Sequence, residues 1–573
     1  MVFDRLPLFT LTADAFEQPF HFSFMSEDKI NQLSEPSAEP SIEKYVCIAV
    51  FVAALLVGAW LRFSDLSMKP FHHDEGVNGH FMLNLVRSHQ YKYDPTNYHG
   101  PSLYYFALVA VVLFGENDFA LRLTPALFGV LTIAMIWLLR RQLGTVGTSV
   151  AAFCVALSPC LVFYSRYFIH EMSFGCFSLG MVVGFWRYAE EKKFHWLALA
   201  AVSTGLLLTT KETSVITVAV FLVAIVCAAI WDTAKRLIQQ RQLTPAAFVK
   251  ALRTDTASVM PTLDHAVAAT IIVVFIHIFL YSSLFNNWQG VTDFFRSIAH
   301  WTEERSNNDH VKIFWYYLGI LLKLELPLVV GSLVAGVFIL WRGNRFWLFT
   351  GACTLGMTLA YSVIPYKTPW LMISFVVPMA LVCGYASEQL YRLSSKLAWQ
   401  MICIAGFVAV LFVCGQISWT VNFVKYDDNG NETGYFFERG KKWEFKPYVD
   451  GTYGYVYAQT DREFLDLIRL IEQEADNFPT KKKTGIYVAS PEHWPLPWYL
   501  RDYPGTDYSG RWPGEPGSAP AISQPIILAH ADQQANLVGV PGWRASSRTY
   551  KLRPGVELML FVRDEAPAAI PSQ

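Results

Sequence analysis

Long apolar segments alternate with short polar ones along most of the chain up to about residue 420. A helix needs about 20 mostly apolar residues to cross the hydrocarbon core of a bilayer, with a lower limit near 17. Most of the apolar segments reach or approach this length, so the pattern predicts a polytopic α-helical membrane protein. The segments cover residues 45–62, 101–114, 119–139, 146–163, 172–188, 195–209, 213–231, 266–285, 313–341, 345–363, 369–386 and 397–418.

The segment 101–114 decides the topology, because it is the shortest and begins with Gly100-Pro101. If it does not cross and the N-terminal tail is cytoplasmic, the basic residues between the spans fall inside, as the positive-inside rule requires. We therefore predict an interfacial or re-entrant helix at 101–114 in the outer leaflet, about eleven transmembrane helices, and a last span that exits outward near Trp419. The basic residues placed inside are Arg140, Arg141, Arg187, Lys192, Lys193, Lys235, Arg236, Arg241, Lys250, Arg253, Arg342, Arg345, Arg392 and Lys396.

The two ends of the chain differ from this pattern. Residues 1–44 are polar and show no basic-then-apolar signal pattern, so we expect a disordered cytoplasmic tail before a transmembrane domain at 45–419. From residue 420 onward no span-length segment remains. Helical spacing at 461–474 and short apolar segments predict a soluble, extracytoplasmic α/β domain at 420–573. The apolar segments predicted as buried strands are 485–488, 525–528 and 556–562.

Composition supports this interpretation and excludes other classes. Hydrophobic residues make up 53% of the chain and charged residues only 16%, whereas soluble domains carry about a quarter charged residues. The net charge of −1 offers no basic field for nucleic acid, so we expect no nucleic-acid partner. The nine cysteines contain no CxxC pair, which argues against a zinc site or a disulfide framework.

Charged residues beside the spans gather on one side of the predicted topology. Charges at the centre of a membrane helix cost about 2.5–3.5 kcal/mol each, so those near spans are functional candidates. All of the candidates fall at the outer ends of spans and come from distant parts of the chain. They are Asp74, Glu75 and His99 in the first outer loop (63–118), Arg166, His170 and Glu171, Lys211 and Glu212, Arg296 and Arg305 in the outer loop 286–312, and Lys367.

Ordinary structural roles remain open for several of these residues. Lys211 and Glu212 suit an ion pair at a helix end, Arg166 suits an interfacial cation that reaches toward water, and Glu171 suits a helix cap. The histidines His72 and His73 suit loop packing as well as contact with a metal or substrate. For Asp74 we favour function, because an acid gains nothing at a lipid interface.

These residue types suit one kind of chemistry. An acid in a semi-enclosed loop can act as a general base for a hydroxyl acceptor. Cations on the same face can hold a phosphate. Beside a lipid bilayer, this combination describes the transfer of a group from a polyprenyl phosphate.

Several motifs also carry a family resemblance. Asp74-Glu75, His99–Tyr105 (HGPSLYY), Gly115–Leu123 (GENDFALRL), and Ser158-Pro159 followed by Arg166 and Glu171 occur in order. This arrangement resembles the protein O-mannosyltransferase-like glycosyltransferases of the GT-C fold, whose layout the aminoarabinose transferases of lipid A share. The likeness covers about residues 45–230. Further motifs are similar to a narrower branch, the membrane proteins known as flippase-activity-associated; these motifs are Lys211-Glu212-Thr213, Tyr366–Trp370 (YKTPW) and His493–Leu500 (HWPLPWYL).

The resemblance implies roles for individual residues. In the family, the first outer loop contains membrane-surface helices and an essential acid, so Asp74 would be the base or would orient the acceptor, with Glu75 in support. Some members use a divalent metal and others do not; here Asp74, Glu75 and His73 would be its ligands. The implied phosphate ligands of the donor are Arg166, Lys211 and Lys367, and the implied substrate contacts are His73, His99, Tyr104, Glu171 and Glu212. The reaction would invert the anomeric centre. His99-Gly100 replaces the basic residue usual in the family's first-loop motif, which puts the acceptor in doubt.

Two aromatic residues of the last domain are further candidates. Trp494 and Trp498 lie in a segment rich in Trp, Pro and Tyr, which suits stacking on sugar C–H groups. The same segment equally suits an ordinary loop-to-helix junction with Pro497 in the first turn.

We expect an enzyme in the cell (plasma or inner) membrane with its active face outside. Its partners would be a polyprenyl-phosphate sugar, the bilayer, and a glycan-assembly or flippase partner protein. The alternatives are a lipid-linked-sugar flippase or transporter and a non-catalytic partner of glycan assembly. Transporters tend to show internal repeats and mid-membrane ionisable residues in broken helices. The sequence shows no such repeat, and its charges gather at one surface, so an enzyme is favoured.

Overall fold

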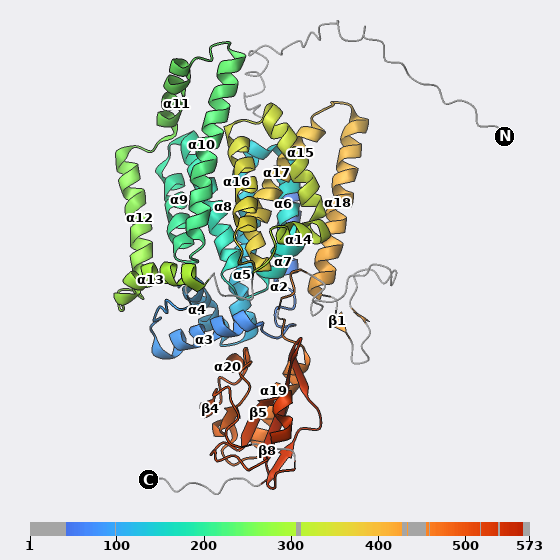
Figure 1. Cartoon of the computed structure of the whole chain (residues 1–573). Coiled ribbons are helices and arrows are strands. Elements are labelled where there is room, and N and C mark those ends of the chain that lie inside the picture. Colours follow the sequence, from blue (N-terminus) through green and yellow to red (C-terminus); the bar gives the residue numbers. More distant parts are fainter. Residues whose placement is uncertain are drawn as a thin grey trace, which may run out of the picture. The chain divides into compact units, whose positions relative to one another are not determined.

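The computed structural model describes residues 42–97, 99–304, 311–423, 425–426, 432–433, 454–457, 459–515, 517–536 and 539–564. Residues 47–573 form one compact unit (Figure 1). The expected tail, 1–44, lies outside the described residues except for the first residues of α2. The helices from α2 to α18 are α2 (Ile42–Phe63), α3 (His73–Ser88), α4 (Ser102–Phe114), α5 (Asp118–Ile136), α6 (Arg140–Leu157), α7 (Pro159–Ser165), α8 (Glu171–Glu191), α9 (Phe194–Leu208), α10 (Ser214–Gln239), α11 (Pro245–Val259), α12 (Leu263–Tyr281), α13 (Gln289–Glu304), α14 (Tyr316–Leu324), α15 (Leu326–Arg342), α16 (Arg345–Val363), α17 (Ile373–Tyr391) and α18 (Leu397–Phe423), with 3₁₀ turns η2 (Trp137–Leu139) and η3 (Pro369–Met372).

Every predicted apolar segment lies on a helix, which confirms a polytopic helical membrane protein. Within the described residues, seven helices are long and apolar enough to cross a membrane, or up to eight if the bent pair α14–α15 is one span. This is fewer than the predicted eleven. The 15-residue α9 is short for a span, α8 does not count among the seven, and residues 118–157 count as one continuous apolar helix although they contain both α5 and α6. The 13-residue α4 rises only about 20 Å, too short to cross, as expected for 101–114.

Residues 118–157 form a helical hairpin, in which α5 and α6 are antiparallel. Phe51 packs on Trp137 with ring centroids 5.0 Å apart, whereas Arg62, at the other end of α2, donates to the Ala156 carbonyl at 3.0 Å. The reversal includes Gly144, whose φ of +76° suits glycine. A Cβ on Gly144 would also lie 2.4 Å from the Glu388 carboxylate, so this glycine is required twice.

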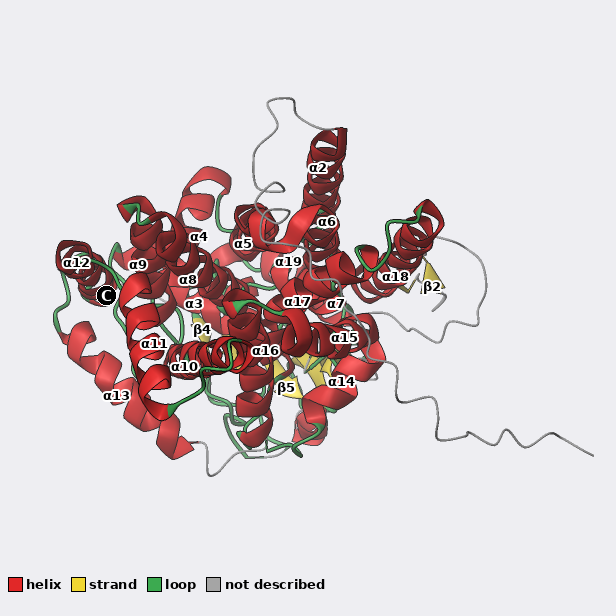
Figure 2. Ribbon diagram, turned by 90° about the horizontal axis from the view of Figure 1, so that it is seen from above, coloured by secondary structure: helices red, strands yellow, loops and turns green. Residues whose placement is uncertain are grey.

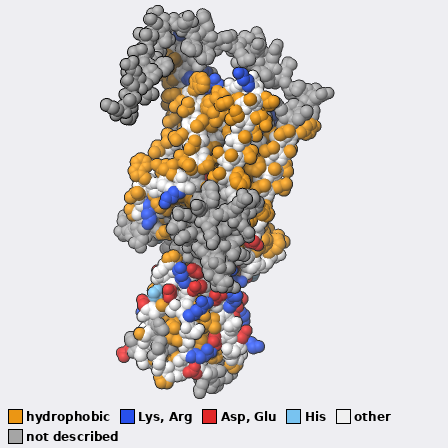
Figure 3. Space-filling view, turned by 90° about the vertical axis from the view of Figure 1, so that its right-hand side faces the viewer, with side chains coloured by type: hydrophobic (Ala, Val, Ile, Leu, Met, Phe, Trp, Pro, Cys, Tyr) orange, Lys and Arg blue, Asp and Glu red, His pale blue; other side chains and the backbone are white. Residues whose placement is uncertain are grey.

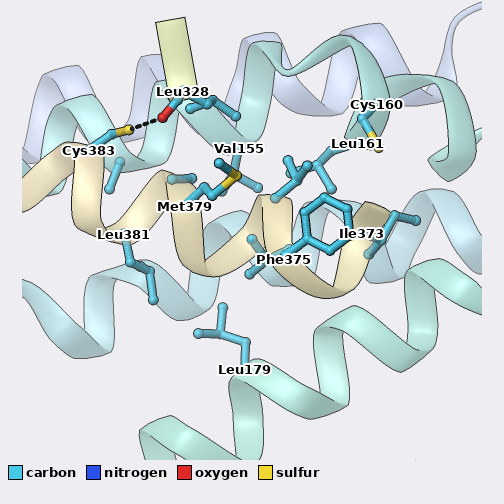
Figure 4. Packing of buried hydrophobic residues seen from close by; sticks show 14 of the residues in the cluster. Val155, Cys160, Leu161, Leu179, Leu328, Ile373, Phe375, Met379, Leu381 and Cys383 are labelled. Atoms are coloured by element: carbon cyan, nitrogen blue, oxygen red, sulfur yellow. Dashed lines mark hydrogen bonds between the residues drawn. The ribbon is translucent and has the colours of Figure 1, made fainter. Parts of the chain in front are cut away.

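The core of the helical region forms around α17. This helix packs against α6, α15 and α16, and its side chains are almost all buried. Figure 4 shows Ile373, Phe375 and Met379 of α17 pointing among side chains from its neighbours. The Cys383 thiol donates to the Leu328 carbonyl at 3.4 Å, which ties α17 to α15. Buried Cys383 and Cys160 thus behave as small apolar packing residues.

The peripheral helices present apolar side chains outward, as a membrane requires. Few side chains of α12 are buried, those of α18 are buried mainly in its last turns, and both helices lie at the periphery in the view of Figure 2. On the face drawn in Figure 3, hydrophobic side chains cover the helical part, while Lys, Arg, Asp and Glu gather over the sheet-containing part. Because lipid offers no hydrogen bonds, helices that satisfy their own backbone suit such a surface.

Three shorter helices join the spans in a way that the sequence predicted only in part. The acidic pair Asp74-Glu75 lies in the first turn of α3 rather than in a loop. Neither α11 nor α13 was expected, since their regions were interpreted as polar loops. In α13, apolar and polar residues alternate at helical spacing, but the segment is too short and too charged to stand out among the spans.

The last part of the chain is a mixed α/β domain, which confirms the predicted helix and all three predicted strands. Its sheet has the order β4-β3-β5-β8-β6, and β7 also pairs with β8. Strand β3 is parallel to β4 and β5, whereas β8 is antiparallel to β5, β6 and β7. Phe464, Leu467 and Ile471 of α19 pack on one face of the sheet. The elements after α18 are β1 (Lys425–Tyr426), β2 (Glu432–Thr433), α19 (Glu463–Asp476), η4 (Lys481–Lys483), β3 (Ile486–Val488), α20 (Leu496–Tyr499), β4 (Thr506–Asp507), β5 (Ile526–His530), η5 (Ala531–Asn536), β6 (Trp543–Ala545), β7 (Tyr550–Arg553) and β8 (Val556–Arg563).

This domain contacts α3 through two glycines that no side chain could replace. A Cβ on Gly76 would lie 2.5 Å from Pro495, and one on Gly79 would lie 2.8 Å from the Trp498 ring. The backbone of α3 therefore packs directly on the segment around α20. Spaced three residues apart, the two glycines share one face of α3 and leave the rest of the helix free for other contacts.

Candidate active site

A cavity of about 300 Å³, here called the polar cavity, opens where the ends of several helices meet beside α3. Its wall comes from the start of α3, the α3–α4 loop, the start of α8, the α9–α10 turn, and the end of α16 with the turn that follows. The lining residues are His73, Asp74, Val77, Asn78, Thr96, Asn97, His99, Ile169, His170, Glu171, Lys211, Glu212, Thr213, Tyr361, Ile364, Tyr366, Thr368, Trp370 and Leu371. Polar residues from distant parts of the chain thus come together in this cavity, as predicted, but Glu75, Arg166 and Lys367 are not among its lining residues.

Asp74 faces this cavity from the first turn of α3. The helix begins with a capping box: the Asp74 N–H donates to His72 Nδ1 at 3.1 Å, and the His72 N–H donates to Glu75 Oε2 at 2.9 Å. The positive end of the helix dipole favours a carboxylate at this position. Within the described residues, the Asp74 carboxylate accepts no hydrogen bond and forms no ion pair, so both of its oxygens remain available to a ligand.

Two ion pairs also line the cavity. Lys211 Nζ lies 2.5 Å from Glu171 Oε1, and both side chains are buried. Burial lowers the pKa of Lys211, but Glu171 and Glu212 outweigh it and raise the pKa overall, so the ammonium stays charged. His99 Nδ1 lies 3.1 Å from Glu212 Oε2. Burial raises the pKa of Glu212, whereas His99 and Lys211 lower it more, and the net effect is a lowered pKa.

Burial lowers the pKa of two other histidines of the lining, His73 and His170, which favours their neutral forms. Burial, opposed by Asp74, lowers the pKa of His73 to about 4. Burial, with His99 and Lys211 nearby, also lowers the pKa of His170. His170 Nε2 lies 3.1 Å from the Gly100 carbonyl, which can only accept, so Nε2 carries the proton.

Glu75, predicted to act beside Asp74, points away from the cavity into a buried network. Its Oε1 accepts from Arg122 Nε at 2.7 Å and from the Phe168 N–H at 2.8 Å. Its Oε2 accepts from Arg122 Nη2 at 2.6 Å and from the His72 N–H at 2.9 Å. Arg122 also donates to the carbonyls of Leu66, Lys69 and Pro70. We call this group the Glu75–Arg122 network. It fixes the start of α3, and it leaves Glu75 no oxygen lone pair for a metal.

Two of the three predicted phosphate ligands are not in the cavity lining. Arg166 donates to the carbonyls of Leu61, Ser64 and Asp65, at 2.5–3.0 Å, and so completes the end of α2. Lys367 donates to the carbonyls of Ile364 and Lys312, at 2.5 and 3.2 Å. The carbonyls at the end of α2 and the Ile364 carbonyl after α16 lie at helix ends, where the helix itself provides no donor for them. Only Lys211 of the three lines the cavity.

The predicted aromatic contacts also lie behind the wall. The Tyr104 hydroxyl donates to Asn78 Oδ1 at 2.9 Å, which places it one residue behind the lining. Trp498 is fully buried, stacks on Phe71, and donates from Nε1 to Asp118 at 2.7 Å. Trp494 is half-buried beside His73 and His80. For this segment the geometry fits the loop-to-helix alternative better than sugar stacking.

The described residues contain no group of three or more His, Cys, Asp or Glu arranged to hold a metal ion. Asp74 and His73 lie side by side on the cavity, but Glu75 is committed to Arg122. Metal dependence therefore gains no support from this geometry.

Sequence reasoning missed several residues of the site. Asn97 carried no motif signal, since it is a common residue in a polar turn. His170 was noted beside Glu171, and Thr213 and Thr368 stood within the KET and YKTPW motifs, but no pattern gave these three a contact of their own in the site. Arg122 stood within the quoted GENDFALRL motif, but its partner, 47 residues away, could not be known. Arg553 of β7, 3.4 Å from His73 Nδ1, came from a separate domain.

A second, apolar cavity of about 30 Å³ lies among α8, α10, α16 and α17, of which α8 and α16 also contribute residues to the polar cavity. Leu179, Phe221, Phe349 and Leu381 contribute to its wall. Along α8, residues 175–182 line the apolar cavity and Glu171 lines the polar one, so the two spaces follow one another along the same helix.

Comparisons with known proteins agree with this architecture. Residues 98–254 match the family model described as dolichyl-phosphate-mannose-protein mannosyltransferase. The fold is similar to that of ArnT from Cupriavidus metallidurans bound to undecaprenyl phosphate, with a TM-score of 0.55 and 15% identity over 93% of this chain and 100% of that one. It is also similar to the archaeal oligosaccharyltransferase AglB from Archaeoglobus fulgidus in complex with an inhibitory peptide and a dolichol-phosphate. That TM-score is 0.53, with 12% identity over 86% of this chain and 70% of that one. A search of curated protein sequences finds no match.

Both solved proteins are GT-C glycosyltransferases, and this chain has the GT-C membrane fold. The predicted resemblance to the mannosyltransferase-like proteins of this fold is therefore confirmed. The narrower flippase-activity-associated branch stays a prediction.

Proposed function

We propose that the protein is a membrane glycosyltransferase that moves a sugar from a polyprenyl-phosphate donor to an extracytoplasmic acceptor. The observation that carries this proposal is the Asp74 carboxylate, which lines the same polar cavity as the buried Lys211–Glu171 pair and has no hydrogen-bond partner among the described residues. The GT-C fold and the family model at 98–254 support the same reaction class.

The proposed step is an inverting displacement. An acceptor hydroxyl attacks the anomeric carbon from the face opposite the phosphate, and the new C–O bond forms as the old one breaks. The proton of the hydroxyl passes to Asp74, which acts as general base. The electron pair of the broken bond leaves on the polyprenyl phosphate, whose charge changes from −1 to −2.

Lys211 is the ammonium of the described lining that can stabilise this developing charge. Its Nζ carries three protons, and the one donated to Glu171 leaves two for a phosphate. His99, paired with Glu212, can add a second positive charge when it is protonated. Arg166 and Lys367 are replaced in this role, since both are committed to backbone carbonyls.

We place the prenyl chain against the apolar side chains of α8, α10, α16 and α17 that line the second cavity, which follow Glu171 along α8. The cavity itself, about 30 Å³, has room for only one or two water molecules, so the chain would have to lie along the outside of these helices or part them. The cluster Arg140-Arg141 lies at the opposite end of α5 from α3, so the positive-inside rule favours an extracytoplasmic site. We place the protein in the cell membrane with this face outside.

The test is transfer of labelled sugar from defined polyprenyl-phosphate donors in proteoliposomes, with a membrane extract of the source cell as acceptor. Wild type is compared with Asp74→Asn and with the matched control Asp264→Asn, an acid at the start of α12 whose side chain is 79% exposed. We expect transfer by wild type and the control and its loss in Asp74→Asn. Equal transfer by all three proteins would refute Asp74 as the base, and a non-catalytic role predicts transfer by none.

A further inference from the structure

Helix α3 begins with a histidine cap, which differs from the side-chain caps of other helices. In α3 the His72 imidazole accepts from the N–H of Asp74, the residue proposed above as general base. Short residues are the ordinary caps, because their side-chain oxygen reaches the free N–H groups of the first turn. The described caps of α5, α7, α11 and α16 follow this rule, at Asn117, Ser158, Thr244 and Asn344.

The second ring nitrogen of His72 has a partner that a shorter residue could not reach. His72 Nε2 lies 2.5 Å from the Tyr457 carbonyl, which can only accept, so Nε2 carries the proton. Nδ1 is then the acceptor for the Asp74 N–H, at 3.1 Å. Nε2 is one bond further from the backbone than any side-chain atom of Ser, Thr or Asn. A neutral imidazole therefore makes both bonds at once.

The His72 ring is also held by packing. It is buried, and its centroid lies 5.7 Å from that of Tyr167 and 6.1 Å from that of Trp370. Trp370 itself lines the polar cavity. The ring therefore has little room to turn away from the Asp74 N–H.

Tyr457 belongs to a segment before α19, residues 454–457 and 459–460, here called the connecting segment. At its start the Tyr455 hydroxyl donates to Glu325 Oε1 at 3.1 Å, at the bend between α14 and α15. At its end the Thr460 hydroxyl donates to the Phe71 carbonyl at 2.6 Å. Bonds on both sides of Tyr457 thus fix the carbonyl that holds His72.

These bonds place Asp74 between two constraints. The Glu75–Arg122 network holds the start of α3 from one side, because the His72 N–H donates to Glu75 Oε2 at 2.9 Å. The His72 imidazole holds the Asp74 N–H from the other. A general base acts only within hydrogen-bond reach of the proton it takes, and a displacement of about 1 Å can cost about 10²-fold in rate.

We propose that His72 is a positioning residue for Asp74, and that the Tyr457 carbonyl fixes its imidazole in the orientation that this role requires. The inference rests on the proposed role of Asp74 as general base. Through the connecting segment, the placement of this base depends on the bend between α14 and α15.

The experiment measures sugar transfer by the purified full-length protein in proteoliposomes, with polyprenyl-phosphate mannose and polyprenyl-phosphate glucose as donors. His72→Phe keeps a ring but loses both bonds. His72→Asn keeps an acceptor for the Asp74 N–H and loses the bond to Tyr457. The matched control is Thr244→Ala, which removes the cap of α11, where Thr244 accepts from the Ala247 N–H at 3.2 Å. No described residue of α11 lines the polar cavity.

We expect His72→Phe to lower kcat about 10–100-fold, with the KM for the donor within about twofold of wild type. His72→Asn should fall between the two, about three- to tenfold below wild type. Thr244→Ala should lower the melting temperature, as a lost cap does, and keep kcat. Because kcat is calculated per folded protein, a purely structural role of His72 predicts the same pattern as Thr244→Ala.

Several results would overturn the inference. A wild-type kcat in His72→Phe would remove the positioning role. Equal kcat values for His72→Asn and His72→Phe would show that the bond to Asp74 contributes nothing. Equal values for His72→Asn and wild type would show the same for the bond to Tyr457. A raised KM at unchanged kcat would assign His72 to donor binding instead.

Two further measurements separate this inference from the proposed function. Adding His72→Phe to Asp74→Asn should cause no further loss, since placement has no effect once the base is removed, and a second full loss would contradict the inference. Hydrogen exchange of the Asp74 N–H, which needs no turnover, should be faster in His72→Phe than in wild type and His72→Asn. Equally slow exchange in these three proteins would overturn the role of His72, whereas undiminished transfer by Asp74→Asn would refute the proposed function.

Discussion

Two regions meet at the first turn of α3 and treat their polar groups in opposite ways. On one side, the Glu75–Arg122 network fills every acceptor position of a fully buried carboxylate. On the other side, the Asp74 carboxylate lines the polar cavity and has no hydrogen-bond or ion-pair partner among the described residues. The two acids are adjacent in the chain, yet one holds the fold and the other is available for a ligand.

The difference shows that burial of a charged side chain does not by itself indicate function. What matters is whether the protein already uses all of its hydrogen-bond acceptors. A buried ion pair whose members are fully hydrogen-bonded is costly to break, but it offers nothing to a substrate. A carboxylate whose oxygens have no protein partner can instead accept hydrogen bonds from a ligand. The Glu75–Arg122 network therefore positions Asp74, and Asp74 is left to contact the ligand of the polar cavity.

The largest expected effect separates the two acids by activity. Asp74→Asn should lower the rate of sugar transfer by about 10²–10⁴-fold, the usual contribution of a general base. It should change the free energy of unfolding by no more than about 0.5 kcal/mol, because no protein contact is lost. Transfer assays in proteoliposomes and thermal unfolding in detergent check both parts. A clear drop in melting temperature would show that Asp74 is structural and would erase the contrast with Glu75.

The reverse pattern is expected for the network. Glu75→Gln leaves the Arg122 charge buried without its counter-ion, and it should lower the free energy of unfolding by about 3–5 kcal/mol. The double variant Glu75→Gln/Arg122→Met removes both charges and should recover part of this loss. Thermal unfolding of the two variants measures it. A stable Glu75→Gln protein that has lost activity would instead assign Glu75 to catalysis.

The contact between α3 and the last domain sharpens the comparison, because it braces the same helix from outside. Gly76→Ala would place a methyl group 2.5 Å from Pro495, so we expect a loss of about 1–3 kcal/mol and reduced transfer. The control is Gly336→Ala in α15, where the added methyl group meets nothing within 4 Å. Equal melting temperatures for the two variants would mean that this contact does not hold α3.

The smallest expected effect is a pH dependence carried by His73. Burial lowers its pKa to about 4 in the folded protein, whereas an unfolded histidine titrates near about 6.5. Between these values the unfolded chain binds more protons, so stability falls as the pH is lowered from about 6.5 toward 4, by up to about 1.4 kcal/mol per pH unit. Melting temperatures of wild type and His73→Gln across this range measure the effect. The variant should show the shallower slope, and parallel curves would contradict the assignment.

Several elements followed from the sequence because their signals are local. Long apolar segments predicted the helices of the bundle. Helical spacing of apolar residues predicted α19, and short apolar segments predicted β3, β5 and β8. The acidic pair after the first span predicted the place of the site, and Lys211 and Glu171 lie there as expected. The helices α11 and α13 were missed, since each is too short and too charged to stand out among the apolar segments. The reversal within 118–157 was predicted as a break between two spans, at 119–139 and 146–163, and the structure has it at Gly144.

The sequence by itself determined a helical membrane protein, an acid pair beside its first span and a mixed last domain, because hydrophobic periodicity is written along the chain. Only the tertiary structure decided which acid is available. Successive residues of a helix point about 100° apart, so the orientation of α3 sends Asp74 to the cavity and Glu75 to Arg122. That orientation depends on Arg122, Phe168 and Pro495, partners distant in the chain whose positions no local pattern encodes. The same holds for Arg166 and Lys367, whose charges were plain in the sequence but whose acceptors were created by the fold.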